Sequence, residues 1–165
     1  RGRRRHGGEA LNMKGEGKVL VSACLAGFEC RYDGKSNTEP DIVRLVRDGK
    51  ALPVCPEQLG GLMTPRSPAE VKTKNGLAGV YNAEGIDVTE WFKKGALKTL
   101  KIAKFYDIRM AILKSKSPSC GVGRIYSGDF SRRLVCGDGI TAKLLKDNGI
   151  NVISDDGYKK EKGSV

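Results

Sequence analysis

The chain reads Lys18-Val-Leu-Val-Ser-Ala-Cys24, an apolar run that ends on a cysteine, and this pattern recurs twice. Ala51-Leu-Pro-Val54 is followed directly by Cys55, and Met110-Ala-Ile-Leu-Lys114 is followed a few residues later by Cys120. Short apolar runs bounded by turn residues predict buried strands. In an open parallel α/β sheet, ligands bind outside the carboxyl ends of the strands. The three cysteines are therefore expected to meet at one site, as a soft-metal site with one coordination position left free.

Helical patterns alternate with these strands. Apolar residues at helical spacing predict helices over 40–48, 88–106 and 141–147, and a last strand is expected at 150–153. Asn75-Gly76, between two strand-like runs, is a two-residue hairpin signal. The predicted fold class is α/β: a single domain with a mostly parallel sheet flanked by helices, Rossmann-like, with a small β-hairpin insertion.

The chain of 165 residues is long enough for one domain with a sizeable core. That domain is expected over 18–158, between a basic, flexible tail at 1–17 and a C-terminal tail at 159–165. Met13-Lys14-Gly15 resembles an ordinary start, so residues 1–12 are treated as an addition and excluded from fold reasoning. No apolar segment follows the basic start, and no apolar run approaches the roughly 20 residues of a membrane span. A cytoplasmic protein without membrane contact is expected.

Charge and cysteine content narrow the function classes. The formal net charge of +11 fits an anionic partner such as RNA or a phosphorylated substrate, or simply a solvated basic surface. Five cysteines, an odd number, favour reduced thiols in metal or catalytic work over a disulfide framework. The one histidine is His6, in the tail, which removes histidine-based triads and histidine metal ligands from the domain. Nothing in the sequence bears on the oligomeric state.

Taken singly, each of the three strand-end cysteines is better explained as a small buried apolar residue, and only the three together favour a site. The other two, Cys30 and Cys136, do not directly follow a predicted inner strand, and spectator roles are expected for both. Glu57, two residues after Cys55, is placed to act as a general base or acid, with a turn or helix cap as the alternative.

Two further segments carry candidate polar groups. Ser117 and Ser119 flank Pro118 before the third cysteine and are candidates to bind a substrate or an oxyanion, or to stabilise the loop. Arg31, Tyr32 and Asp33 combine a cation, a ring and a carboxylate, which suits a planar polar heterocycle or an ordinary surface turn. The glycine pairs near residues 121–123 and 137–139 match neither a dinucleotide fingerprint nor a P-loop.

Seven motifs together resemble the thiouracil desulfidase family, and they span nearly all of residues 18–155. They are Val21-Ser-Ala-Cys-Leu-Ala-Gly27, Cys30-Arg-Tyr-Asp-Gly34, Pro53-Val-Cys-Pro-Glu-Gln-Leu-Gly-Gly61, Thr64-Pro-Arg66, Asp87-Val-Thr89, Ile112-Leu-Lys-Ser-Lys-Ser-Pro-Ser-Cys-Gly121 and Gly139-Ile-Thr-Ala142. The family often has a second leucine where this chain has Ala26.

The resemblance implies a [4Fe-4S] cluster bound by Cys24, Cys55 and Cys120, with one open iron free to take sulfur from a thiocarbonyl. It implies Glu57 as the catalytic glutamate and Ser117 or Ser119 as the catalytic serine, with Ser117 preferred. The implied reaction is hydrolytic: oxygen replaces the sulfur of 2- or 4-thiouracil or its nucleoside, and hydrosulfide is released.

Three alternatives stay open at this stage. One is a zinc or other metal-binding module without catalysis. Another is an RNA-binding module, acting on thiolated tRNA without independent catalysis. The last is a thiol-based transferase that uses Cys55 or Cys120 as its nucleophile.

Overall fold

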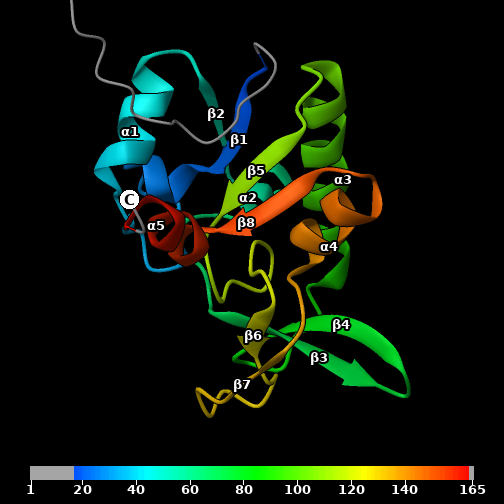
Figure 1. Ribbon diagram of the computed structural model, residues 1–165. Helices are drawn as coiled ribbons and strands as arrows, with labels where there is room; N and C mark the ends of the chain where they lie inside the picture. The colour runs from blue at the N-terminus through cyan, green and yellow to red at the C-terminus, as the bar shows by residue number, and fades with distance from the viewer. Residues whose placement is uncertain (1–16, 164–165) are drawn as a thin grey trace, which may run out of the picture.

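A four-stranded parallel sheet lies at the centre of the computed structural model, which describes residues 17–163. Its strand order is β2-β1-β5-β8, and every neighbouring pair is parallel (Figure 1). The strands are β1 (Val19–Ser22), β2 (Ala51–Val54), β5 (Met110–Leu113) and β8 (Asn151–Ser154). All three cysteine-bearing segments therefore leave the sheet at the same edge, because the carboxyl ends of parallel strands lie together.

Helices cover both faces of this sheet (Figure 1). They are α1 (Pro40–Arg47), α2 (Pro56–Leu59), α3 (Thr89–Phe105), α4 (Ile140–Asp147) and α5 (Asp155–Gly163), with a 3₁₀ turn η1 (Ala23–Ala26) after β1. One face buries Leu20 and Leu113 against Leu100 of α3 and Leu145 of α4. The other face carries a second cluster, in which the sheet residues Val21 and Ile112 belong with Ile42 of α1 and Tyr158 of α5. Burial of these apolar faces is what stabilises the three layers.

Two antiparallel hairpins lie beyond the carboxyl edge of the sheet (Figure 1). They pair β3 (Ala69–Lys74) with β4 (Leu77–Asn82), and β6 (Arg124–Tyr126) with β7 (Leu134–Cys136). Asn75 and Gly76 have φ of 50° and 77°, the left-handed conformations that a tight hairpin turn requires. A third apolar cluster, which includes Val71, Val80 and Ile125, joins both hairpins to Phe92 of α3.

The predicted α/β fold class with its hairpin insertion is confirmed. Sequence patterns missed β6 and β7 because three residues are too few to show a period. They also missed α5, whose sequence is almost entirely polar and buries only Asp155 and Tyr158. The predicted boundary at residue 158 falls inside this helix, and the predicted tail at 1–17 lies outside the described residues except for Gly17. Among residues 17–163, no helix is long and apolar enough to cross a membrane.

Candidate active site

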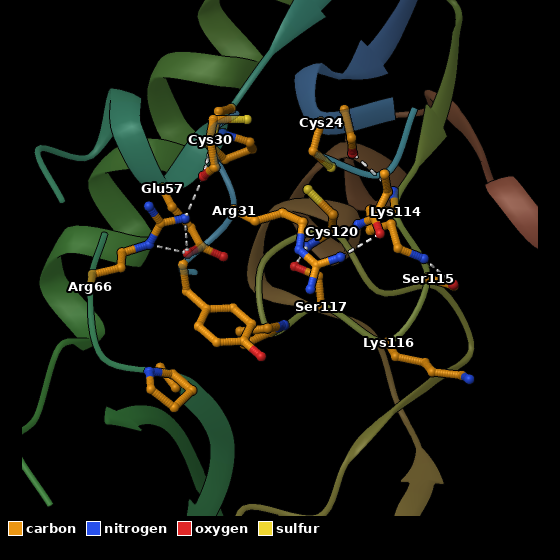
Figure 2. A pocket seen from close by; sticks show the side chains of 18 of the residues that line it. Cys24, Cys30, Arg31, Glu57, Arg66, Lys114, Ser115, Lys116, Ser117 and Cys120 are labelled. Carbon is orange, nitrogen blue, oxygen red and sulfur yellow. Dashed lines mark hydrogen bonds and ion pairs between the residues drawn. The ribbon is translucent and has the colours of Figure 1, made fainter. Parts of the chain in front are cut away.

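A cavity of about 520 Å³ opens at the carboxyl edge of the central sheet. It is lined by residues from the segments that follow β1, β2 and β5, together with side chains from the two hairpins. Cys24, Cys55 and Cys120 all line it, as the strand-end pattern predicted, and Cys30 lines it as well. Figure 2 shows Cys24, Cys30 and Cys120 around this cavity. Cys136 lies exposed on β7. Four of the five thiols therefore face one cavity.

These four thiols are largely withdrawn from water. Cys24, Cys30 and Cys120 are 8, 4 and 6% exposed, and all five cysteines are free of disulfides. Burial raises the pKa of the Cys120 thiol to about 12. A hydrogen bond with Cys24 raises the pKa of the Cys30 thiol to about 11. The pKa of the Cys55 thiol is also raised, mainly by a hydrogen bond with Cys30 and secondly by burial. Binding of a metal group to them would have to release protons.

The thiols surround the cavity and do not converge on one point. Among residues 17–163, no three histidine, cysteine or acidic side chains are close enough together to hold a single metal ion. Cys55 Sγ donates a weak hydrogen bond to the Cys30 carbonyl oxygen over 3.8 Å, so these two segments are in contact. The prediction that Cys30 stands apart as a spectator did not anticipate this position beside Cys24 and Cys55.

Glu57 forms a buried ion pair with Arg66. Both Nε and Nη2 of Arg66 lie 2.7 Å from Glu57 Oε2, and the two side chains are only 10% (Arg66) and 15% (Glu57) exposed. Arg66 Nη2 also donates to the Cys30 carbonyl oxygen at 2.9 Å. Burial raises the pKa of Glu57, and the guanidinium of Arg66 partly opposes that shift. The carboxylate is thus held in one orientation at the wall of the cavity.

The Glu57 segment is positioned by direct backbone contact between α2 and α3. A Cβ on Gly95 would lie 1.9 Å from the Pro56 carbonyl oxygen, and a Cβ on Gly60 would lie 2.1 Å from the Trp91 carbonyl oxygen. Only glycine fits at these two positions, since any side chain would force the helices apart. The close contact between α2 and α3, which glycine permits, therefore fixes the positions of Cys55 and Glu57.

The two candidate serines have different surroundings. Ser117 lines the cavity, and its Oγ accepts hydrogen bonds from the backbone N–H groups of Ser119 (3.1 Å) and Cys120 (3.0 Å). Ser119 is 1% exposed and shares a 2.8 Å hydrogen bond with the hydroxyl of Thr141. It is not among the described residues that line the cavity. Of the two, only Ser117 is within reach of a bound molecule.

The loop that carries Ser117 and Cys120 is held by the beginning of α4. The backbone N–H of Thr141 donates to the Ser119 carbonyl oxygen at 2.9 Å, and the N–H of Ile140 donates to the Pro118 carbonyl oxygen at 2.9 Å. A Cβ on Gly139 would lie 2.5 Å from that same Ser119 carbonyl oxygen. The third cysteine thus rests on a helix terminus that approaches as closely as backbone atoms allow.

Two residues of the Arg31-Tyr32-Asp33 segment line the cavity, and the third supports one of them. Arg31 and Tyr32 line the cavity. Asp33 accepts from Arg31 Nε at 3.1 Å and from Nη2 at 2.9 Å, and it is not among the described lining residues. Asp33 therefore orients the guanidinium and does not reach the cavity itself.

Sequence reasoning did not assign roles to several cavity residues. Arg66 and Lys114 stood inside the quoted motifs, but nothing in their spacing showed what they would bind. Glu70 gave no signal at all, yet its Oε2 accepts from the backbone N–H groups of Gly128 (2.9 Å) and Phe130 (3.0 Å). That contact holds the loop between β6 and β7 at the cavity mouth.

The cavity is cationic on balance, since Glu57 and Glu70 face five basic side chains: Arg31, Arg66, Lys114, Lys116 and Arg132.

Comparison with known proteins identifies relatives of this architecture. The solved structure of the [4Fe-4S]-dependent thiouracil desulfidase TudS matches with a TM-score of 0.80 and 43% identity, over 87% of this chain and 94% of that chain. The uncharacterized protein YbbK of Bacillus subtilis (strain 168) is 48% identical over 143 residues, which are 83% of this chain and 95% of YbbK. The model of the 2-thiouracil desulfurase family matches residues 19–157. The chain belongs to the 2-thiouracil desulfurase family.

Proposed function

We propose that this protein is a [4Fe-4S]-dependent desulfidase that exchanges the sulfur of a thiocarbonyl nucleobase for oxygen. Its substrate would be 2- or 4-thiouracil or the corresponding nucleoside, and hydrosulfide would be the second product. Family membership and the likeness to TudS support this proposal. The observation that carries it is that Cys24, Cys55 and Cys120 line the same cavity as the buried carboxylate of Glu57.

The donor set suits an iron–sulfur cluster. Cysteine thiolates are the usual ligands of such clusters, and soft sulfur donors select them over harder cations. Cys24, Cys55 and Cys120 would hold the cluster from three strand ends, which leaves one iron without a protein ligand. When bound, the cluster would supply a Lewis-acidic iron that accepts the departing sulfur. Cys30 is not part of this ligand set and lies on the loop that follows η1.

Glu57 would act as the general base. Its carboxylate can take a proton from a water molecule that adds to the thiocarbonyl carbon. Arg66 keeps that carboxylate oriented and favours its ionised form, because the guanidinium lies 2.7 Å away. Water supplies the oxygen of the product and sulfur leaves as hydrosulfide, so the exchange needs no net transfer of electrons.

Ser117 would donate to the oxyanion of the tetrahedral species. A hydroxyl has two acceptor lone pairs and one proton. The N–H groups of Ser119 and Cys120 donate to Ser117 Oγ, so its own proton is directed to a further acceptor. A donor fixed in this way stabilises negative charge without reorganisation. Arg31 and Tyr32, which line the same cavity, would hold the planar ring of the substrate.

Anaerobic reconstitution with iron and sulfide tests the proposal. The reconstituted protein should remove the ultraviolet thiocarbonyl band of 2- or 4-thiouracil, or of its nucleoside, and release sulfide. Alanine at Cys24, Cys55 or Cys120 should abolish cluster binding. Cys136→Ala is the matched control, since that thiol lies outside the cavity, and Cys30→Ala should also retain the cluster.

Three results would contradict parts of this picture. Loss of the cluster in Cys30→Ala would overturn the ligand assignment. Desulfuration that persists with zinc in place of iron would overturn the cofactor. Turnover of thiolated tRNA with none of the free base or nucleoside would replace the substrate class.

A further inference from the structure

Asp155, at the start of α5, is a buried carboxylate whose contacts go to the β5 loop, which we define as residues 114–121. Its side chain is 4% exposed. Oδ1 accepts from the backbone N–H of Ser115 at 2.7 Å, and Oδ2 accepts from Lys114 Nζ at 3.0 Å. Forty residues of sequence separate Asp155 from Ser115, so this contact exists only in the folded chain.

The hydrogen bonds of the Asp155 side chain go to Lys114 and Ser115, and another residue caps its helix. The hydroxyl of Ser154 accepts from the backbone N–H of Gly157 at 2.9 Å and so caps the first turn of α5. Burial alone would raise the pKa of Asp155, but the N–H of Ser115 and the ammonium of Lys114 together hold that pKa below its usual value. The β5 loop therefore stabilises the ionised carboxylate of Asp155, and the carboxylate in turn holds the loop through Ser115 and Lys114.

The same loop is tied to β1 on its other side. The backbone N–H of Lys114 donates to Ser22 Oγ at 2.9 Å, and its Nζ donates to Ser115 Oγ at 2.9 Å. The Ser22 hydroxyl also interacts with the thiol of Cys120. A continuous set of contacts thus leads from Asp155 to a candidate cluster ligand.

The residue that follows Ser115 has a strained backbone conformation. Lys116 has a φ of 64°, a left-handed conformation that residues with side chains rarely adopt. Such conformations persist only where the surrounding structure holds them. Asp155 holds the residue before Lys116, and the next residue is Ser117. Lys116 itself forms a bridge with Ile125 of β6, so the chain is held on both sides of Ser115–Lys116 as it enters the Ser117–Cys120 turn.

We propose that Asp155 is a positioning residue for desulfuration, which acts through Ser115 and Lys114 to place the Ser117 hydroxyl and the Cys120 thiol at the cavity. This inference rests on the proposed function. It gives α5, a helix that the sequence patterns missed, a part in building the site.

The test compares Asp155→Asn and Asp155→Ala with Asp156→Asn in reconstituted holoenzyme. Asp156 is the matched control because it lies in the same first turn of α5 but is exposed. Measurements are iron content, the electron paramagnetic resonance spectrum of the reduced cluster, and kcat and KM per bound cluster. Loss of a group that supports a ligand from behind commonly costs about 10- to 100-fold in activity or metal affinity.

We expect kcat per cluster to fall about tenfold in Asp155→Asn, which keeps an acceptor for Ser115, and about 100-fold in Asp155→Ala. KM should change little, and the spectrum should shift in both variants. Lys114→Met should resemble Asp155→Asn and should not add to Asp155→Ala, because the two side chains act as one unit.

The inference is overturned if both Asp155 variants match Asp156→Asn in kcat per cluster and in spectrum. It is also overturned if their losses follow only the fraction of folded protein, measured by circular dichroism. Should the unmodified holoenzyme fail to desulfurate thiouracil, the proposed function fails. The spectroscopic comparison then still decides whether Asp155 positions the cluster loop.

Discussion

The segment after β2 and the segment after β5 lie on different sides of the cavity and are held by different kinds of contact (Figure 2). The β2 segment carries the Glu57–Arg66 ion pair and rests on α3 through glycine. The β5 loop carries Ser117 and Cys120, held by backbone hydrogen bonds from α4 and by Asp155 from behind. We call the β2 segment the charged wall, because it holds a buried ion pair at the cavity, and the β5 loop the second wall, because it holds a hydroxyl and a thiol there through backbone contacts.

The largest effect should come from the charged wall. Glu57→Gln removes the proposed base but keeps the shape of the side chain, so kcat should fall by about 10³-fold, within the range for general base catalysis. The cluster should remain, because the cysteines are unchanged. Iron content and single-turnover loss of the thiocarbonyl band measure the two separately. A variant with full cluster and ordinary turnover would remove Glu57 from the mechanism.

Two serine variants distinguish a catalytic from a structural role within the second wall. Ser117→Ala should lower kcat by about 100-fold, the usual cost of removing one oxyanion donor. Ser119→Ala should leave kcat per folded molecule nearly unchanged. It should lower the free energy of unfolding by about 1–3 kcal/mol, because the Thr141 hydroxyl loses its buried partner. Steady-state kinetics and thermal unfolding check both, and a reversed pattern would exchange the roles of the two serines.

Gly95→Ala tests how the charged wall is positioned. The added methyl would meet the Pro56 carbonyl oxygen, so α2 and α3 must separate, at an expected cost of about 1–3 kcal/mol of stability. The separation would also displace Cys55 and Glu57 and lower activity per folded molecule. Gly85→Ala gives the contrast for crowding, since a Cβ there would meet open space although its φ is positive. Equal activity per folded molecule in Gly95→Ala would show that the helix contact serves stability alone.

The smallest effect is a shift in pH dependence. In Arg66→Met the pKa of Glu57 should rise, because burial continues to disfavour the carboxylate while the opposing guanidinium is gone. A base that must be ionised is then lost at a higher pH, so the acidic limb of kcat/KM should move to higher pH. Arg31→Met is the control, since its guanidinium is paired with Asp33. If the acidic limb of kcat/KM stays in place in Arg66→Met, then Glu57 is not the group whose ionisation sets it.

Much of this architecture was readable from local patterns. The apolar runs before Cys24 and Cys55 became neighbouring parallel strands, and Asn75-Gly76 became a hairpin turn. The position of the three cysteines at strand ends followed from those runs. The role of Cys30 was not readable, because its nearness to Cys24 depends on how the loop after η1 returns to the sheet.

The sequence by itself determined the central parallel sheet, the strand-end cysteines and the absence of histidine from the domain, because these depend on residue type and on periods of a few residues. Only the tertiary structure decided that Glu57 pairs with Arg66, that Ser117 meets the cavity while Ser119 does not, and that Asp155 holds the β5 loop. Each of these contacts depends on where backbone and side chains come together in the fold. Their energy depends on burial, and burial is a property of the packed molecule that no local pattern carries.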